Sequence, residues 1–403
     1  MLSSVNWVWV SNCVQFAGWG VLALLLAEVL RDGYHVLCHE VKWLSKWHNK
    51  HHQVYRRDLS IVSLQAYQDS QLYHDIVESS LLVTLLTIIA LVFHQMGLWL
   101  GVAYGCSFLY GACVRYFFGT SDTDYNHLPG PLQIIPSVWW VNRTYHWRHH
   151  FDNVNAYYSG VFPLVDKILG TALSLKGKTV AITGASGSLG QALTAELLKH
   201  NAKVVALTTN PDKLPAQDNL KVVSWELGNE AELKNALAKV DILIINHGVN
   251  VYHDRTPQAI AASYEVNTFS ALRLIDIFSA TVTSPQAKAT KEIWVNTSEA
   301  EVSPALSPLY ELSKRTLGNI VTLKRLDGNC VIRKLILGPF KSQLNPYGVM
   351  SAEQVAGGIL FWAKRDYRNI VITINPFTYL LFPVKEASTW LYYRIFSQKS
   401  RHE

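Results

Sequence analysis

Three clusters of histidines constrain the fold of this chain more than any other feature. Eleven of its 15 histidines precede residue 151. Eight of these form three patterns: His35-x-x-x-His39, His48-x-x-His51-His52 and His146-x-x-His149-His150. Residues three or four apart lie on one face of a helix, so each cluster directs two or three imidazoles to one point. Neutral imidazole suits iron and zinc, and the three clusters together predict a site for two metal ions.

The number of histidines also bears on what the metal does. A closed structural zinc site needs only four ligands, so eight favour a dinuclear reactive centre. A lone histidine is usually structural or solvated, and we expect this of His74 and His94. The five cysteines are scattered and form no C-x-x-C pair. We therefore expect neither disulfides nor a thiolate metal site, which is typical of a reducing compartment.

Long apolar segments in the same region predict an integral membrane protein. Trp7–Leu30 has about the length that a bilayer requires, and Ser79–Phe118 is long enough for two spans that turn near Gln95–Gly97. Five Lys and Arg residues lie between positions 42 and 57, just after the first span, and the positive-inside rule places them in the cytoplasm. The histidine clusters would then face the cytoplasm and receive a lipid-like substrate from the bilayer.

The character of the sequence changes near residues 171–178. Beyond this point short apolar segments alternate with helical patterns, which predicts parallel β-α-β units. We expect an all-α membrane domain at 1–172, and at 173–403 an α/β domain with a doubly wound parallel sheet. The predicted strands are 178–183, 202–208, 221–225, 240–246, 292–296 and 330–337.

The histidine-rich part resembles the membrane fatty acid hydroxylase/sterol desaturase superfamily over about residues 15–172. The resemblance rests on the histidine patterns, on Asp32 and Trp47 just before the first two, and on the closing Asp166-Lys-Ile-Leu-Gly170-Thr171. It implies two iron ions, with zinc as the alternative, which use molecular oxygen and two electrons to hydroxylate or desaturate a C–H bond. The implied ligands are His35, His39, His48, His51, His52, His146, His149 and His150, with His127 as an additional one.

Two motifs carry the chemistry of the second half. Thr183-Gly-Ala-Ser-Gly-Ser-Leu-Gly190 lies between a predicted strand and a helix, where glycines let the backbone approach a pyrophosphate at the helix N-terminus. Tyr310-x-x-x-Lys314 places a phenol and an ammonium on one helix face. We expect the ammonium to lower the pKa of Tyr310 from its usual value of about 10, which favours acid–base work. Ser298, after the strand at 292–296, would hold a substrate oxygen.

Together these features resemble the short-chain dehydrogenase/reductase family, with its Rossmann fold, over about residues 176–370. Asn246-His-Gly248, Asn267 and Gly338-Pro339 add to the match. The resemblance implies that Tyr310 transfers the proton, Lys314 holds the ribose and tunes Tyr310, Ser298 orients the carbonyl or alcohol, and Asn267 supports a proton relay. The implied nucleotide-binding residues are Gly184, Ser186, Gly187, Leu189, Gly190, Thr208, Asn246, Gly248, Lys314 and Ser342.

The sequence departs from the commonest pattern of that family in two places. The glycine spacing G-x-x-G-x-x-G is more typical of its long-chain branch, and an alignment that puts Glu299 in the place of the catalytic serine stays open. The second strand is not followed by an acid that would bind the ribose 2′-hydroxyl. This favours NADP over NAD, with Thr208, Thr209 and Lys213 near the 2′-phosphate and Glu226 on the adenine side.

The C-terminal segment 375–396 is rich in aromatic and aliphatic residues. Two interpretations stay open: a dimer interface, which would make the chain a homo-oligomer, or an interfacial segment that docks on the bilayer. Residues 1–172 carry 10 Lys and Arg and 11 Asp and Glu, of 36 and 30 in the whole chain. The remainder therefore has 26 and 19, a net charge of +7, which would assist binding to anionic lipid.

We hypothesise a bifunctional membrane oxidoreductase of lipid metabolism. A di-iron hydroxylase or desaturase acting on a sterol, fatty acid or carotenoid would be fused to an NADP-dependent dehydrogenase that acts on a lipid alcohol or ketone. The sequence has no haem or flavin motif, so an external ferredoxin or cytochrome would supply electrons. We expect no nucleic-acid partner. The alternative is that only the reductase is active and the histidine domain is a metal-poor anchor or scaffold.

Overall fold

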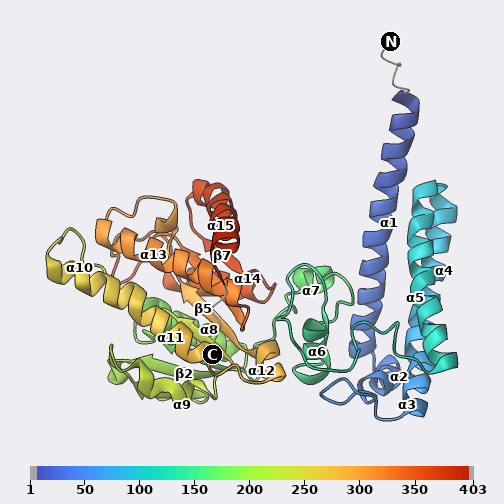
Figure 1. The fold of residues 1–403 in the computed structure, drawn as a ribbon, viewed down its shortest axis with the longest axis horizontal. Helices are drawn as coiled ribbons and strands as arrows, with labels where there is room; N and C mark the ends of the chain where they lie inside the picture. The colour runs from blue at the N-terminus through green and yellow to red at the C-terminus, as the bar shows by residue number, and fades with distance from the viewer. Residues whose placement is uncertain (1–6, 399–403) are drawn as a thin grey trace. The chain divides into compact units, whose positions relative to one another are not determined.

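The computed structural model describes residues 7–398, which form two compact units (Figure 1). The histidine unit comprises the residues up to Pro131 together with Pro136–Ala172, and the sheet unit comprises Leu132–Ile135 and the chain from Leu173 onward. The apolar core of the histidine unit lies between long helices, and that of the sheet unit lies on both faces of a β-sheet.

Three helical stretches of the histidine unit are long and apolar enough to cross a membrane: Trp7–Glu40, Leu64–Phe93 and Met96–Phe118. They correspond to the three spans predicted from the sequence. Small residues such as Ala23 and Gly101 lie where helices meet, and a Cβ on Gly101 would lie 2.9 Å from that of Ala23. Such residues let membrane helices approach closely. The helices are α1 (Trp7–Glu40), α2 (Lys42–His52), α3 (Leu64–Ser70), the π-helix η1 (Gln71–Asp75), α4 (Ile76–Phe93), η2 (Met96–Leu98), α5 (Trp99–Phe118), α6 (Arg143–Phe151) and α7 (Leu164–Leu169).

The sheet unit is built on seven parallel strands in the order β3-β2-β1-β4-β5-β6-β7. This confirms the predicted α/β class with a doubly wound sheet. The sequence indicated six of the strands to within two residues at each end, but not β7, which has only four residues. The strands are β1 (Thr179–Thr183), β2 (Lys203–Thr208), β3 (Leu220–Ser224), β4 (Ile242–Ile245), β5 (Glu292–Asn296), β6 (Val331–Leu337) and β7 (Asn369–Ile372).

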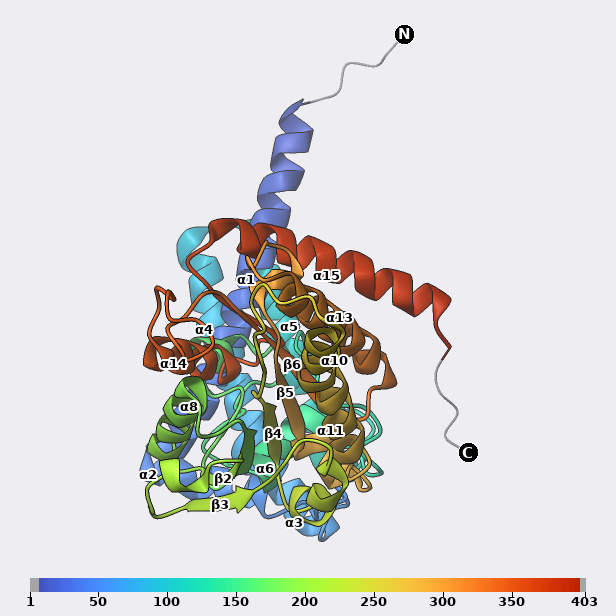
Figure 2. The same ribbon diagram turned by 90° about the vertical axis from the view of Figure 1, so that its left-hand side faces the viewer.

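Helices cover both faces of this sheet (Figure 2). One core cluster joins α8 and α14 to the sheet, and another joins α11 and α13 to its other face. The strand order reverses between β1 and β4, where open α/β sheets bind ligands beyond the carboxyl ends of the strands. The helices are α8 (Ser188–Lys199), η3 (Pro211–Lys213), η4 (Glu230–Leu233), α9 (Lys234–Leu237), α10 (Pro257–Tyr264), the π-helix η5 (Glu265–Phe269), α11 (Ser270–Ser279), α12 (Pro285–Thr290), η6 (Glu299–Glu301), α13 (Pro308–Lys324), η7 (Arg325–Asp327), α14 (Ala352–Ala363) and α15 (Pro376–Phe396).

Candidate metal centre and nucleotide pocket

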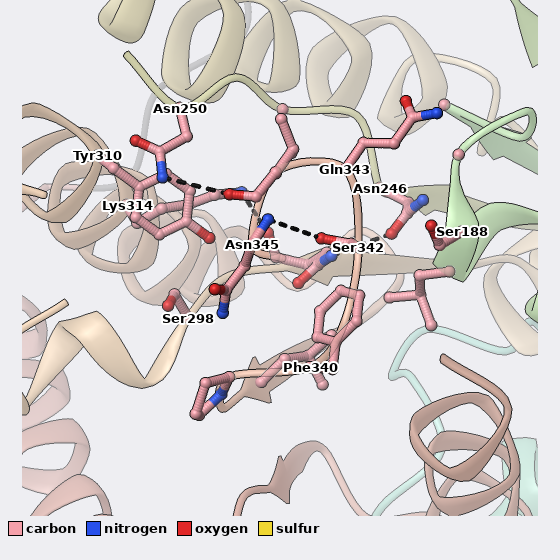
Figure 3. A pocket seen from close by; sticks show the side chains of 18 of the residues that line it. Ser188, Asn246, Asn250, Ser298, Tyr310, Lys314, Phe340, Ser342, Gln343 and Asn345 are labelled. Carbon is pink, nitrogen blue, oxygen red and sulfur yellow. Dashed lines mark hydrogen bonds between the residues drawn. The ribbon is translucent and has the colours of Figure 1, made fainter. Parts of the chain in front are cut away.

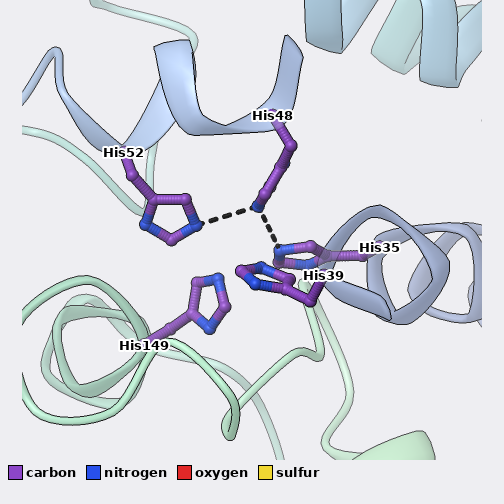
Figure 4. Close-up of side chains that lie close together, drawn as sticks. All are labelled: His35, His39, His48, His52 and His149. Carbon is purple, nitrogen blue, oxygen red and sulfur yellow. Dashed lines mark hydrogen bonds between the residues drawn. The ribbon is translucent and has the colours of Figure 1, made fainter. Parts of the chain in front are cut away.

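The structure brings all nine histidines named from the sequence into two adjacent groups. They come from the end of α1, from α2, from the loop after α5 and from α6. In each group the ligand atoms lie within 4.8 Å of one another. Group A, drawn in Figure 4, contains His35, His39, His48, His52 and His149. Group B contains His51, His127, His146 and His150.

The ring nitrogens within each group converge closely. In group A the Nε2 atom of His48 lies 3.2 Å from that of His35 and 2.8 Å from that of His52 (Figure 4). In group B the Nε2 atom of His127 lies 2.9 Å from that of His146 and 3.0 Å from that of His150. Each neutral imidazole has only one N–H, so hydrogen bonds alone do not satisfy such a cluster, whereas a shared cation does.

Carbonyl and carboxylate oxygens hold several of these rings from behind. The Nδ1 atoms of His35 and His149 lie 2.6 and 2.8 Å from the carbonyl oxygens of Tyr158 and Ala156, and Nδ1 of His127 lies 2.7 Å from Asp124 Oδ1. Such partners fix the tautomer that leaves Nε2 free to bind a metal.

The closing sequence motif of this domain, Asp166 to Thr171, holds the segment that contains Tyr158 and Ser159. The Asp166 carboxylate accepts hydrogen bonds from the backbone N–H groups of Tyr158 and Ser159, and from the Thr171 hydroxyl. Gly170 ends α7 with a φ of +74°, a conformation that favours glycine. The motif therefore positions the carbonyl group that orients His35.

The donor set of both groups fits a metal ion. The Nε2 atoms of His39 and His149 are buried and have no hydrogen-bond partner within the described part of the chain. Burial and neighbouring imidazoles lower the pKa values of His48, His51, His146 and His150 far below the usual range, and burial lowers that of His149 to about 3. The rings are thus neutral at physiological pH, as metal ligation requires.

One further histidine, His74, lies between the two groups. It is buried on the π-helix η1, with its Nε2 atom 3.2 Å from Nδ1 of His48. Together with Asp75 and His51 it forms another cluster with metal-ligating geometry. The sequence indicated only a structural or solvated histidine here, because no second histidine stands at a helical spacing from it.

A cavity of about 330 Å³ opens onto the histidines within this unit. Many of the side chains that line this cavity are ionisable. These include Arg31, Asp32, Asp75, Glu78, Arg115 and Asp124. Its lining offers hydrogen bonds to a polar group.

In the sheet unit, the glycine loop after β1 forms a cradle for a phosphate. Gly184 has a φ of +62°, and a Cβ on Gly190 would collide with the Gly184 carbonyl oxygen. Gly187 precedes α8 without a side-chain cap, so the first N–H groups of that helix are open to an anion. Ser186 accepts a hydrogen bond of 2.7 Å from the Thr208 hydroxyl at the end of β2.

This cradle opens into a cavity of about 830 Å³ at the carboxyl ends of the strands (Figure 3). Trp225 Nε1 and His247 Nε2 are buried here without a partner among the described residues, which leaves polar atoms for a bound nucleotide. The predicted residues that line it are Gly184, Ser186, Gly187, Leu189, Thr208, Asn246, Gly248, Ser298, Tyr310, Lys314 and Ser342. Thr209 also lines it, whereas Glu226 and Lys213 are exposed and do not.

The predicted catalytic side chains meet in this cavity or just behind it. Ser298 and Tyr310 both line the cavity, and Ser298 lies close enough to oppose the rise in the pKa of Tyr310. Lys314 donates a hydrogen bond of 2.9 Å from Nζ to the Asn296 carbonyl oxygen. Asn267 is buried on the π-helix η5, where Oδ1 accepts from the N–H of Val249 at 2.8 Å.

The sequence left open whether Ser298 or Glu299 occupies the position of the catalytic serine, and the structure gives the two residues different surroundings. Both residues line the cavity, and Ser298 is the one that affects the pKa of Tyr310. The Glu299 carboxylate instead accepts hydrogen bonds from the hydroxyls of Thr373 and Thr378, at 2.6 and 3.2 Å. Glu299 thus connects the end of β5 to α15.

The pKa of Tyr310 differs from the sequence-based expectation. We expected Lys314 to lower it, but burial raises it above the usual range. The Lys314 ammonium lies 5.9 Å from the centre of the Tyr310 ring and donates to a carbonyl group instead of to the phenol. Desolvation of the phenolate therefore outweighs the attraction of the ammonium here.

Comparison with known proteins covers both units. A family model for fatty acid hydroxylases matches residues 20–171, and a model for NAD(P)H-binding domains matches residues 184–305. A 3-oxoacyl-[acyl-carrier-protein] reductase FabG of Rickettsia bellii is 36% identical over 85 residues, which are 19% of this chain and 35% of that protein. A solved short-chain dehydrogenase from Burkholderia cenocepacia in complex with NADP is 18% identical with a TM-score of 0.46, and covers 56% of this chain and 100% of its own.

The chain thus joins a part that matches fatty acid hydroxylases to a part that matches NAD(P)H-binding domains, carries helices long and apolar enough to cross a membrane, and is an enzyme. The monoglucosyldiacylglycerol epimerase of Synechocystis sp. is 52% identical over 401 residues, which are 95% of this chain and 98% of that protein. The chain belongs to the family of this epimerase, because the two are alike over almost their whole length.

Proposed function

We propose that the sheet unit inverts one secondary alcohol in the glucosyl headgroup of a diacylglycerol glycolipid. The observation that carries the proposal is that Ser298, Tyr310 and Lys314 line the same cavity as the phosphate cradle. The relative that is similar along the whole chain is named an epimerase of monoglucosyldiacylglycerol. A secondary alcohol is inverted without net oxidation when it is oxidised to a ketone and then reduced from the opposite face.

The chain's own residues would hold the proton in this cycle. NADP, which the glycine loop and Lys314 would hold, would supply the acceptor and donor of a hydride at the alcohol carbon. Tyr310 receives the hydroxyl proton in the first half and donates it back in the second, so atoms and electrons balance. Ser298 orients the substrate oxygen and opposes the rise in the pKa of Tyr310, and Lys314 would hold the ribose.

The cavity suits a sugar beside the nucleotide. Its volume of about 830 Å³ lies in the upper part of the range for small-molecule sites. Five Asn and Gln residues line it, among them Asn250, Gln343 and Asn345 (Figure 3), and amides both donate hydrogen bonds to hydroxyl groups and accept them. A sugar whose ketone is reduced from the other face must turn between the two hydride transfers, which a narrow cleft would prevent.

The residues after β2 favour NADP for this cycle over NAD. Thr208 and Thr209 line the cavity, and Asn210 follows them, so no acid stands where one would bind the ribose 2′-hydroxyl. Threonine hydroxyls instead offer hydrogen bonds to a 2′-phosphate. Binding titrations with NADPH and NADH would compare the two cofactors directly.

The test is conversion of monoglucosyldiacylglycerol by the full chain in lipid nanodiscs, with the product sugar identified by NMR. We expect an epimer from the wild type, none from Tyr310→Phe, and wild-type conversion from Tyr264→Phe on α10. In D₂O the inverted carbon should carry no solvent deuterium, because the hydride returns within the pocket. Solvent deuterium at that carbon, or activity in Tyr310→Phe, would reject this mechanism.

A second proposal concerns the histidine unit, and its support is the convergence of nine buried or half-buried imidazoles. We propose that groups A and B hold two iron ions, or zinc in their place, at the cytoplasmic side of the membrane. Bound iron would supply oxygen-dependent oxidation of a C–H bond, with electrons from an external ferredoxin or cytochrome. The charged cavity beside group B favours the polar part of a lipid as the group that reaches it.

Metal analysis of purified protein tests this second proposal without relying on activity. We expect about two ions per wild-type chain and a clear loss in His149→Ala, with His253→Ala in the sheet unit as the matched control. An untargeted comparison of lipids from cells with wild type or His149→Ala would then reveal a lipid that gains oxygen or loses hydrogen. A wild-type protein free of metal would leave the histidine unit as an anchor or scaffold.

A further inference from the structure

The helix α15 of the sheet unit exposes an apolar face to its surroundings. Its packed side consists of Thr378, Phe382 and Glu386, which are buried. The opposite stripe of a surface helix is normally polar, but here five apolar side chains on it are more than half exposed, and Ser388 is the polar residue among them. This stripe, which we call the apolar stripe, consists of Phe377, Leu380, Val384, Leu391 and Ile395.

Buried ion pairs hold α15 in this rotation. The Glu386 carboxylate on its packed side accepts from Lys334 Nζ at 2.7 Å and from Arg325 Nη1 at 3.0 Å. Turning the helix to hide the apolar stripe would separate the Glu386 carboxylate from both cations, and breaking a buried ion pair is costly. The exposure of the stripe is therefore a fixed property of the unit.

The first turn of α15 is joined to the catalytic cavity. Thr378 donates to Glu299, the neighbour of Ser298, and the Asn375 amide donates to the Ser303 hydroxyl at 3.2 Å. The chain then continues through Leu306, which lines the cavity and is 87% exposed. Tyr347, also in the lining, is 92% exposed. Two highly exposed apolar side chains therefore line the cavity to which the first turn of α15 is joined.

We propose that the apolar stripe and Leu306 dock the sheet unit on the lipid bilayer. The same chain carries three helices that are long and apolar enough to cross a membrane, so these helices would tether the sheet unit to the membrane. From Leu173 onward the chain has a net charge of +7, since it carries 26 of the 36 basic and 19 of the 30 acidic residues, which favours an anionic lipid surface. An apolar helix face of this kind buries itself at the boundary between headgroups and acyl chains.

This docking explains how a lipid-borne sugar reaches Tyr310. With Leu306 at the membrane surface, a glycolipid enters the cavity headgroup first while its acyl chains remain in the bilayer. The identity of that headgroup rests on the proposed function above, whereas contact with the bilayer does not. Figure 2 shows α15 running along the edge of the unit and extending past α13.

The experiment measures contact between α15 and acyl chains directly. In the full chain, the accessible Cys13, Cys106 and Cys113 are replaced by serine, which leaves only the buried Cys38 and Cys330. A fluorophore is attached to Leu380→Cys or Leu391→Cys, and to Asn235→Cys on α9, which lies at the other end of the sheet unit in Figure 1. Nanodiscs with one chain each contain phosphatidylglycerol and phosphatidylcholine carrying a nitroxide on the acyl chain.

We expect several-fold stronger quenching at positions 380 and 391 than at position 235, with NADPH binding unchanged as evidence of folding. Equal quenching at all three positions would overturn the proposal. Cross-linking between copies through Leu391→Cys at higher protein density, without quenching in single-chain nanodiscs, would also overturn it and assign the face to a second copy. Because the readout is independent of turnover, failure of the epimerase proposal is distinguishable from failure of docking.

Discussion

The charge of the buried Lys314 changes within the range of ordinary assay conditions, because burial lowers its pKa to about 8. The ammonium is present below this pH and is lost above it. We therefore expect the affinity for NADPH to fall as pH rises through about 8, since a cation that would hold the ribose disappears. Fluorescence titration of the full chain at each pH measures this. Lys314→Arg stays charged and should show no such fall, and a flat profile in the wild type would contradict the assignment.

A second single-residue prediction concerns Asp124, which lies behind group B. It accepts from Nδ1 of His127 and from the hydroxyls of Tyr55 and Tyr67 at 2.8 and 3.1 Å. Losing such a support typically weakens metal binding by about 10–100-fold, and we expect this of Asp124→Asn. Metal content after dialysis against a graded chelator measures the affinity. Asp122→Asn, an exposed neighbour, is the control, and equal retention in both variants would count against a metal in group B.

At the scale of elements, the turn from β1 into α8 depends on close packing at Gly190. A Cβ there would press on the Gly184 carbonyl oxygen and the Ala185 backbone, and overpacking of this kind costs about 1–3 kcal/mol. We expect Gly190→Ala to lower both the melting temperature and NADPH affinity. Gly357→Ala on α14 meets nothing within 4 Å and should be neutral or slightly stabilising, because alanine is the better helix former. Unaltered NADPH binding in Gly190→Ala would show that the loop does not hold the nucleotide.

Periodic elements were predictable from the sequence, and local irregularities were not. Strands such as β5 and the helix faces of the histidine clusters follow from spacing alone. The two π-helices η1 and η5 do not, because a π-helix adds one residue to a turn without a distinct sequence pattern. His74, the histidine that the sequence did not indicate as part of the site, lies on η1, and Asn267 lies on η5. The predicted direction of the shift in the pKa of Tyr310 was wrong. This pKa depends on burial and on where Lys314 points, and residue spacing specifies neither.

At the scale of the whole molecule, the two units hold different chemistry in separate cores. The nine histidines of groups A and B belong to one compact unit, and Tyr310 and the glycine loop belong to the other. Each site should therefore survive loss of the other. We expect His149→Ala to keep NADPH binding, and Tyr310→Phe to keep its metal. Loss of both properties in either variant would mean that the sites depend on one another for folding.

The same separation predicts which reactants the epimerisation needs. An alcohol that is oxidised and then reduced at one carbon consumes no oxidant, whereas oxidation of a C–H bond by a di-iron centre consumes oxygen and two electrons. We expect conversion of the glycolipid in nanodiscs to proceed at an unchanged rate without oxygen and without an electron donor. The measurement is the initial rate in an anaerobic chamber against the rate in air, with Tyr310→Phe as the inactive reference. A rate that is lower without oxygen than in air would place a step of the conversion in the histidine unit. The two units would then be successive parts of one reaction.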